Sequence, residues 1–374
     1  MIGLYIHIPF CKSICSYCDF YKMIASDKRI DRYIEVLIDE LKKKRTDLID
    51  VNTIYIGGGT PSHLGVSRWQ NLFEALLSAI EIKKIEEFTV ECNVEDITED
   101  LLMLFRDHFV SRISLGIQSF NERKIRLLNR HHTKDQAIQN ARLIRSTLGE
   151  NISLSFDLIY GVMGETIQDL KEELDHLLNL SPDHVSIYSL ILEEKTILHR
   201  KWEKDEYIPL DEDLESAMFF HIKQTLEDAG YVHYETSNFA KPGKQSKHNM
   251  NYWNLGQYLG LGAGASSHID HIRWTNPRNL NRYEANVQSS GTDFIDIETL
   301  ETIDQMKEEL IVGLRKINGI DLSQFYRTHQ ISAFEQFPVL DVLLEEKWLV
   351  QEDEMLRIAT DKLYMANHVF RKLI

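Results

Sequence analysis

Cysteine is scarce in this chain of 374 residues, which contains four. Cys11, Cys15 and Cys18 lie within eight residues of one another, and Cys92 stands apart. The apolar first ten residues lack a basic segment and so do not form a secretory signal, and cytosolic thiols stay reduced. We therefore exclude a disulfide framework and expect Cys92 to be a core residue.

Long apolar runs and positive charge are also in short supply. No stretch of about 18 apolar residues occurs, so we expect no membrane-spanning helix. The chain has 42 Lys and Arg against 58 Asp and Glu, a net charge of −16. Nucleic acid is therefore excluded as a main partner, because phosphate binding needs an excess of Lys and Arg. We therefore expect a cytoplasmic protein. Its composition is compatible with peripheral membrane contact and with a homodimer.

The three clustered cysteines have the spacing C-x3-C-x2-C, in the stretch from His7 to Phe20. A loop this short can bring three thiolates together, and thiolates are the soft ligands that iron–sulfur clusters prefer. Three cysteines on a four-iron cluster leave one iron without a protein ligand. Catalytic zinc sites differ from structural ones by such an open coordination position, where a small molecule binds. A zinc site with His7 as its fourth ligand remains an alternative.

Strand-like and helix-like periods alternate through the first half of the chain. The predicted strands are residues 4–8, 53–56, 88–92, 112–117, 152–159 and 185–190. The predicted helices lie between them, at about 30–41 with Asp27 as cap, 69–80, 99–105, 121–128, 134–148 and 167–178. Six such units imply right-handed crossovers and a parallel sheet, and they predict an α/β fold, a partial (β/α)6 TIM-like barrel.

Unusual residues recur where these strands end. The cysteines follow the first strand and three glycines, Gly57 to Gly59, end the second. The later strands end at Glu91, Gln118, Asp157, and Tyr188 with Ser189. Because chemistry in parallel barrels collects at the carboxyl ends of the strands, we expect one site on this rim.

The second half is less regular. A charged bridge at 193–213 is followed by a predicted helix at 214–229 and a predicted strand at 231–234. A stretch of small residues at 260–267 and a polar loop at 276–292 come next, and we expect the small residues to line the cleft. An amphipathic helix at 303–314 leads into helices near 322 and at 334–345 and a hairpin at 348–359, a winged-helix-like α+β region. We predict a barrel at 1–195, a connecting region at 196–298 and a C-terminal domain at 299–374. We interpret His131-His132 and His268-x-x-His271 as surface residues.

Together with His248-Asn249-Met250-Asn251-Tyr252-Trp253, these motifs resemble the radical SAM superfamily over nearly the whole chain. Within it the sequence is most similar to the HemN/HemW branch, on the side of the haem chaperones. The resemblance implies a [4Fe–4S] cluster on Cys11, Cys15 and Cys18, with S-adenosylmethionine (SAM) on the open iron. It implies further cofactor-binding residues at Tyr5, Tyr17, Gly58, Gly59, Thr60, Glu91, Gln118, Arg130, Asp157 and Ser189, and a haem site at His248, Asn249 and Tyr252.

Two departures separate this chain from the decarboxylating members of the branch. Those enzymes carry a further cysteine two residues after the third, where this chain has Phe20, and a long extension before the cluster. The resemblance therefore implies haem binding and delivery to acceptor apoproteins, respiratory haemoproteins among them, without coproporphyrinogen III dehydrogenase activity. That dehydrogenase, a radical SAM oxidative decarboxylase, is the alternative, and a zinc-stabilised binding protein is a third hypothesis.

Overall fold

A computed structural model of the chain describes residues 1–289 and 291–374. Six consecutive parallel strands form its centre, each hydrogen-bonded to the next. They are β1 (Ile2–Ile8), β2 (Val51–Gly58), β3 (Glu87–Asn93), β4 (Arg112–Gln118), β5 (Ser153–Tyr160) and β6 (His184–Ser189). The predicted partial barrel of six parallel strands is confirmed, with strand ends that differ by a few residues.

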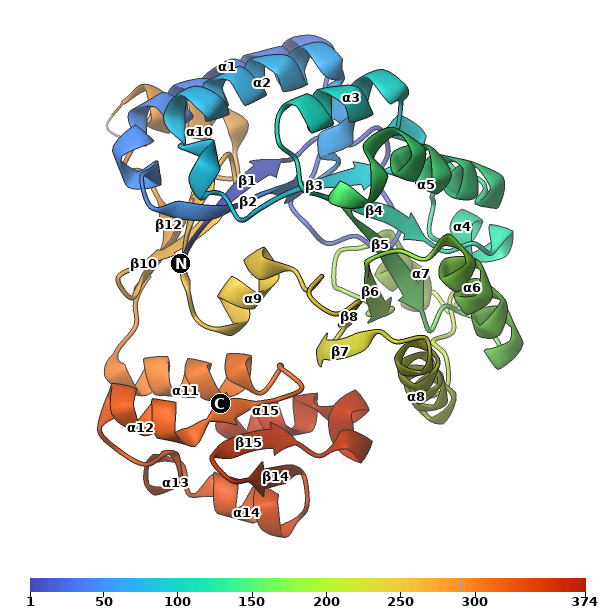
Figure 1. The fold of residues 1–374 in the computed structure, drawn as a ribbon, viewed down its shortest axis with the longest axis vertical. Coiled ribbons are helices and arrows are strands. Elements are labelled where there is room, and N and C mark those ends of the chain that lie inside the picture. The colour runs from blue at the N-terminus through green and yellow to red at the C-terminus, as the bar shows by residue number, and fades with distance from the viewer. Residues whose placement is uncertain (290) are drawn as a thin grey trace.

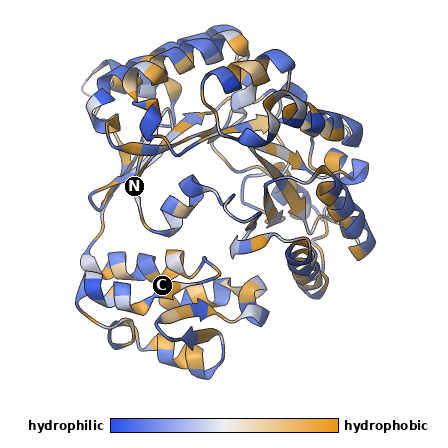
Figure 2. Cartoon of the chain, in the orientation of Figure 1, coloured by the Kyte–Doolittle hydropathy of each residue, from blue (hydrophilic) through white to orange (hydrophobic). Residues whose placement is uncertain are grey.

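Helices follow five of these strands and cover the outer face of the sheet (Figure 1). They are α1 (Asp27–Lys43), α2 (Val66–Ala79), α3 (Glu99–Asp107), α4 (Glu122–Leu127) with α5 (Lys134–Leu148), and α6 (Ile167–Leu180). Their hydrophobic residues alternate with hydrophilic ones, as amphipathic packing requires (Figure 2). Trp69, Phe73 and Phe105 are fully buried beneath α2 and α3. Within the described ranges, no helix combines the length and the apolar character needed to cross a membrane.

The start of α1 differs from the prediction. Asp27 is the first helical residue, and Ser26, whose backbone is extended, holds the capping position. An extended backbone is typical of a residue that precedes a helix. Asp27 instead lies in the first turn of α1, where the positive end of the helix dipole stabilises its negative charge.

Segments from the second half of the chain extend both edges of the sheet. On the β6 side lie β8 (Asn238–Ala240) and β7 (Val232–Glu235), and on the β1 side lie β9 (Gln257–Leu261), β10 (Ser266–Ile269), β11 (Ile272–Thr275) and β12 (Ile295–Thr299). The order of the twelve strands is β12-β11-β10-β9-β1-β2-β3-β4-β5-β6-β8-β7. An open barrel leaves two edges of unpaired backbone groups, and these strands satisfy them. The small-residue stretch at 260–267 therefore pairs within the sheet instead of lining the cleft.

Four helices connect or flank these strands. The charged bridge contains α7 (Ile197–Trp202), and α8 (Glu212–Asp228), α9 (Lys247–Trp253) and α10 (Leu280–Gln288) follow it. The predicted polar loop at 276–292 is thus wrong, apart from residue 290, which lies outside the described residues. Asn279 caps α10 by accepting from the N–H groups of Asn281 and Arg282, and Leu280, Tyr283 and Val287 are buried.

The C-terminal unit combines helices with a three-stranded antiparallel sheet in the order β13-β15-β14, as predicted for a helix-and-hairpin region. Its elements are α11 (Thr302–Gly313), β13 (Ile320–Asp321), α12 (Leu322–His329), α13 (Ala333–Gln336), α14 (Val339–Glu345), β14 (Leu349–Glu352), β15 (Met355–Ile358) and α15 (Asn367–Leu373). The helix predicted at 334–345 is interrupted before Pro338, because the residue preceding a proline disfavours helical backbone. The division of the chain at residues 195 and 298 stays a prediction.

Candidate functional site

A cavity of about 380 Å³ opens at the carboxyl ends of the parallel strands. It brings together most of the predicted site residues. They are Cys11, Cys15, Tyr17, Cys18, Gly58, Gly59, Thr60, Glu91, Gln118, Arg130, Asp157, Ser189 and Asn249. The described residues that line it do not include Tyr5, His248 or Tyr252.

The cysteine loop is anchored near its start and near its middle. Near its start, the N–H of Cys11 donates to the carbonyl of Met23 at 2.9 Å. Near its middle, Ser16 donates through its N–H to the carbonyl of Leu128 and through Oγ to that of Leu127, at the end of α4. The three cysteines are free thiols and half-buried at the cavity mouth. The backbone therefore holds three sulfur donors at one opening.

Two donors from other elements point at the sulfurs. The hydroxyl of Thr60 donates to Cys11 Sγ at 3.5 Å, and Arg130 Nη1 donates to Cys15 Sγ at 3.6 Å. Burial raises the pKa of the Cys11 thiol to about 11 and also raises the pKa of Cys18. A bound metal supplies the positive charge that favours the thiolate form, so metal binding would release protons here.

The glycines at the end of β2 allow two strand ends to approach closely. Gly58 has φ of +116°, and a Cβ there would lie 2.6 Å from the His7 ring. A Cβ on Gly59 would lie 2.8 Å from the carbonyl carbon of Pro9. The N–H groups of Gly59 and Thr60 donate to the carbonyls of Ile8 and Phe10, which joins this turn to the start of the cysteine loop.

Two half-buried carboxylates face the cavity. Glu91 accepts hydrogen bonds from the Tyr55 hydroxyl at 2.6 Å and from the Gly58 N–H at 3.0 Å, and Asp157 accepts one from Ser114. Burial raises the pKa of Glu91 to about 7 and that of Asp157 to about 6. Near neutral pH each group can therefore accept a hydrogen bond from a ligand hydroxyl or donate one.

Arg130, like Arg112, is a buried cation of the site. Its Nη2 donates to Asn93 Oδ1 at 2.8 Å and to the Gly116 carbonyl at 2.7 Å. Burial alone would lower its pKa, but Tyr17 and Cys15 outweigh this and keep the guanidinium charged. Gln118 sits nearby with φ of +64°, at a register shift between β4 and β5. Ser189 also lines the cavity and donates to Glu215.

The HNxxYW motif forms α9, which packs on β1 and β2. Both ring nitrogens of His248 are engaged: Nδ1 with the Thr53 hydroxyl at 2.8 Å and Nε2 with the Tyr252 hydroxyl at 2.9 Å. Burial lowers the pKa of His248 to about 4, so the ring is neutral at pH 7. Of the three predicted haem residues in this motif, Asn249 alone lines the cavity.

Tyr5 and His7 form a second engaged pair. The Tyr5 hydroxyl bonds to His7 Nδ1 at 2.9 Å, and His7 Nε2 bonds to the carbonyl of Tyr21 at 2.8 Å. With both nitrogens occupied, His7 has no free position for a zinc ion held by the cysteines. The described residues contain no group of three or more His, Cys, Asp or Glu that could hold a metal ion directly.

Several interior residues were missed by the sequence analysis. Tyr55, Ser114, Ser155, Ser186 and His184 line the inner part of the cavity. The sequence signal that could have identified them is the alternation of polar and apolar residues along each strand. Polar residues two positions apart on a strand face the same side of the sheet. Two histidines were also interpreted wrongly: His132 and His268 are buried and do not lie on the surface.

Two family models match the chain. The radical SAM superfamily matches residues 5–177, and the HemN C-terminal domain matches residues 300–360. A protein named heme chaperone HemW from Lactococcus lactis is 35% identical over 99% of this chain and 96% of its own. A protein of the same name from Bacillus subtilis is 33% identical over 95% of this chain and 94% of its own.

A solved structure shows the same fold. Coproporphyrinogen III oxidase (HemN) from Escherichia coli, a radical SAM enzyme, aligns with a TM-score of 0.87. The alignment covers 100% of this chain and 89% of that one, at 20% sequence identity, and so supports the fold alone. On the sequence relationships above, the chain belongs to the HemW family of the radical SAM superfamily.

Proposed function

We propose that this protein binds haem and delivers it to acceptor apoproteins, respiratory haemoproteins among them, while carrying a [4Fe–4S] cluster and SAM. The observation that carries the cofactor assignment is the grouping of three free cysteines at the mouth of one cavity walled by strand ends. The haem assignment is supported by relatives named heme chaperones that align over nearly the full chain. The cytoplasm as location, peripheral membrane contact and a homodimer stay predictions.

Cys11, Cys15 and Cys18 would hold the cluster. Three thiolates are the donor set that iron–sulfur clusters use, and the fourth corner is left open. When bound, the cluster supplies an iron site for a chelating ligand and an electron. Thr60 and Arg130 donate to two of the sulfurs, and such hydrogen bonds tune a cluster's potential.

SAM would occupy the cavity beside the cysteines, whose volume of about 380 Å³ is in the range of small-molecule pockets. Gly58 and Gly59 bring the backbone close to the ligand, and Arg130 supplies a positive charge for its carboxylate. Glu91 and Asp157 can accept hydrogen bonds from ribose hydroxyls. Tyr17, Thr60, Gln118 and Ser189 complete the proposed contacts, and Tyr5 acts from outside the cavity through His7.

Haem binding at α9 follows from the motif and the relatives. His248 as iron ligand would have to give up its hydrogen bond to Thr53 or to Tyr252. Its neutral ring suits metal ligation, because a protonated imidazole has no lone pair to offer. Asn249 and Tyr252 would then contact the porphyrin.

Anaerobic reconstitution with iron and sulfide tests the cluster. We expect about four irons per chain in the wild type and a loss of cluster absorbance in Cys15→Ala. The matched control is Cys92→Ala, since this buried cysteine lies on β3 and should leave the iron content unchanged. A colourless wild-type preparation containing zinc and no sulfide would reject the cluster and restore the zinc hypothesis.

Haem delivery is tested by loading the protein with haemin and mixing it with an apo-haemoprotein. We expect the haem to move to the acceptor, seen as a change in the Soret band. Incubation with coproporphyrinogen III, SAM and a reductant should give no protoporphyrinogen, since Phe20 stands where the decarboxylating enzymes carry a cysteine. Product formation in that assay would instead establish the dehydrogenase.

A further inference from the structure

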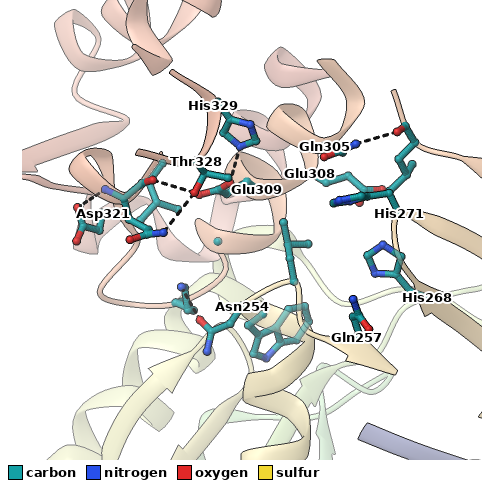
Figure 3. Close-up of a pocket in the computed structure, with 17 residues that line it drawn as sticks. Asn254, Gln257, His268, His271, Gln305, Glu308, Glu309, Asp321, Thr328 and His329 are labelled. Carbon is teal, nitrogen blue, oxygen red and sulfur yellow. Dashed lines mark hydrogen bonds and ion pairs between the residues drawn. The ribbon is translucent and has the colours of Figure 1, made fainter. Parts of the chain in front are cut away.

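A second cavity, of about 430 Å³, lies between the main sheet and the C-terminal unit. Figure 3 shows His268, His271 and Gln257 on one wall and Asp321, Thr328 and His329 on the opposite wall. The end of α9 also contributes to it, through Trp253, Asn254 and Leu255. The cavity therefore joins the HNxxYW motif to the C-terminal unit, away from the cysteines.

His268 on β10 differs from the other histidines of this cavity. It is 7% exposed, and its Nε2 has no hydrogen-bond partner in residues 1–289 or 291–374. By contrast, His329 Nε2 is paired with Glu309 at 2.8 Å, and His271 lies at the turn of the β10–β11 hairpin. Burial lowers the pKa of His268, with help from Arg273 and His271, so the ring is neutral. A buried, neutral imidazole without a partner costs stability unless a ligand engages it.

The apolar residues Trp253 and Leu255 line the cavity at the end of α9, and Leu255 adopts an unfavourable backbone conformation there. Leu255 has φ of +53°, in the position after the helix where glycine is usual. The N–H of Leu255 donates to the carbonyl of Tyr252, and that of Gly256 donates to the carbonyl of Asn251, which is the hydrogen-bond pattern of a Schellman helix end. Leucine in a left-handed conformation is uncommon, and it places an aliphatic side chain beside Trp253 in the cavity wall.

Lys316 lines the cavity and has no carboxylate in direct contact among the described residues. Arg273 pairs with both carboxylate oxygens of Glu308, and His329 pairs with Glu309. Lys316 donates only to the neutral amide of Asn254, at 2.9 Å, among the hydrogen bonds of the described residues. Burial lowers the pKa of Lys316, although Glu309 opposes this. An entering carboxylate would favour its charged form.

We propose that this interdomain cavity is the haem site, with His268 as an axial ligand to the iron and Lys316 paired with a propionate. The proposal rests on the proposed haem function and moves the iron ligand from His248 to His268. A flat aromatic ligand would stack on Trp253 and contact Leu255, Leu300 and Ile320. Imidazole is a common axial ligand to haem iron.

Haemin titration of the full-length protein tests the site. We expect His268→Ala to weaken binding at least tenfold and to shift the Soret band of bound haem, and added imidazole to restore the band. His221→Ala, on α8 and outside this cavity, is the control and should bind as the wild type does. Lys316→Gln should weaken haem binding without moving the Soret band. His268→Gln, which keeps a polar side chain, serves if the alanine variant fails to fold.

The outcomes separate the two proposals. If His268→Ala and His268→Gln bind haem with wild-type affinity and spectrum while His248→Ala does not, the haem function stands and the interdomain site is wrong. If the wild type itself does not bind haem, both the proposed haem function and the interdomain haem site are wrong. Leu255→Gly adds an independent check: we expect unchanged or greater thermal stability with weaker haem binding, and unchanged haem binding would count against the cavity.

Discussion

His248 on α9 packs against β2, where its ring bonds to Thr53. The burial of this ring leads to a prediction about how stability depends on pH. Burial lowers its pKa to about 4, whereas the unfolded chain takes up this proton near the ordinary value of 6.5. Between these two pH values the unfolded state binds the proton and the folded state does not, so falling pH destabilises the protein. At pH 5 we expect one such histidine to lower the free energy of unfolding by about 2 kcal/mol.

Urea unfolding between pH 8 and pH 5 measures this effect. His248→Gln should be less stable at pH 8, since it loses its contacts with Thr53 and Tyr252, but its stability should fall less steeply with acid. Burial also lowers the pKa of His7 to about 4, so part of the slope will remain in this variant. Identical slopes in wild type and variant would show that His248 is not buried as a neutral ring.

Gly58 yields a second prediction at the residue scale. Its positive φ and the 2.6 Å approach of a Cβ to the His7 ring mean that Gly58→Ala must displace this ring from its hydrogen bonds with Tyr5 and Tyr21 or shift the backbone of β2. We expect a loss of more than about 2 kcal/mol in stability and weaker SAM binding. Gly65→Ala is the control for backbone strain, because Gly65 has φ of +78° and ψ of 160°, a region that almost only glycine adopts, but open space around its Cβ; it should cost about 1–3 kcal/mol and leave SAM binding unchanged. Thermal unfolding and SAM titration of both variants distinguish the steric effect from backbone strain.

At the scale of elements, a buried ion triad joins α4 to α6 behind the cavity. Lys124 is fully buried and donates to Glu165 and to Glu173, each at 2.6 Å. Glu173 also accepts from the N–H groups of Phe120 and Asn121, in the loop that follows Gln118. The triad therefore fixes the segment that carries one wall of the site.

Removing the cation should be costly. Lys124→Met leaves two carboxylates buried without their partner, and we expect the free energy of unfolding to fall by about 3–5 kcal/mol in denaturant titrations. Arg126→Met is the matched control on the same helix: its side chain is exposed and lies 4.0 Å from Glu122, so it should change stability by less than about 1 kcal/mol. Equal effects of the two substitutions would contradict the role of the triad.

At the scale of the whole molecule, few polar links attach the C-terminal unit to the main sheet. Arg273 on β11 forms a bidentate ion pair with Glu308 on α11, and the carbonyl of Arg315 accepts from Thr236. Bidentate pairs of this kind are stronger than single surface contacts. This pair contributes to the position of α11 against the hairpin, together with the hydrogen bonds from the Ile317 N–H to the Tyr234 carbonyl and from Lys316 to Asn254.

We expect Arg273→Gln to loosen the C-terminal unit without unfolding the barrel. Hydrogen exchange should become faster in α11 and α12 and stay unchanged in β1 to β6, with a local cost of about 1 kcal/mol. Arg327→Gln is the control, since this arginine is exposed and 3.9 Å from Asp321. Unchanged exchange in α11 of Arg273→Gln would mean that apolar packing alone holds the unit.

Much of the molecule could be predicted from local sequence. The six strands, their helices and the rim positions follow from periodicity, because apolar spacing records which face of an element is buried. Among the strands added at the edges, β7 was predicted, as residues 231–234, but the others and α10 could not be predicted in this way. Glu40 shows why: a carboxylate is typical of an exposed position, yet Glu40 is buried and accepts from Tyr283 at 2.6 Å. These two residues are 243 positions apart in the chain, so no local pattern links them.

The donor set of this protein can be identified without the fold: three cysteines in one short loop, and the acidic, basic and glycine residues at successive strand ends. Alternation and parallel crossovers suffice for that, because they bring all strand ends to one rim. Only the tertiary structure decided which histidines are free. His7 and His248 are engaged at both nitrogens, and His268 keeps a buried nitrogen unpaired, because hydrogen-bond partners come from segments that meet only on folding.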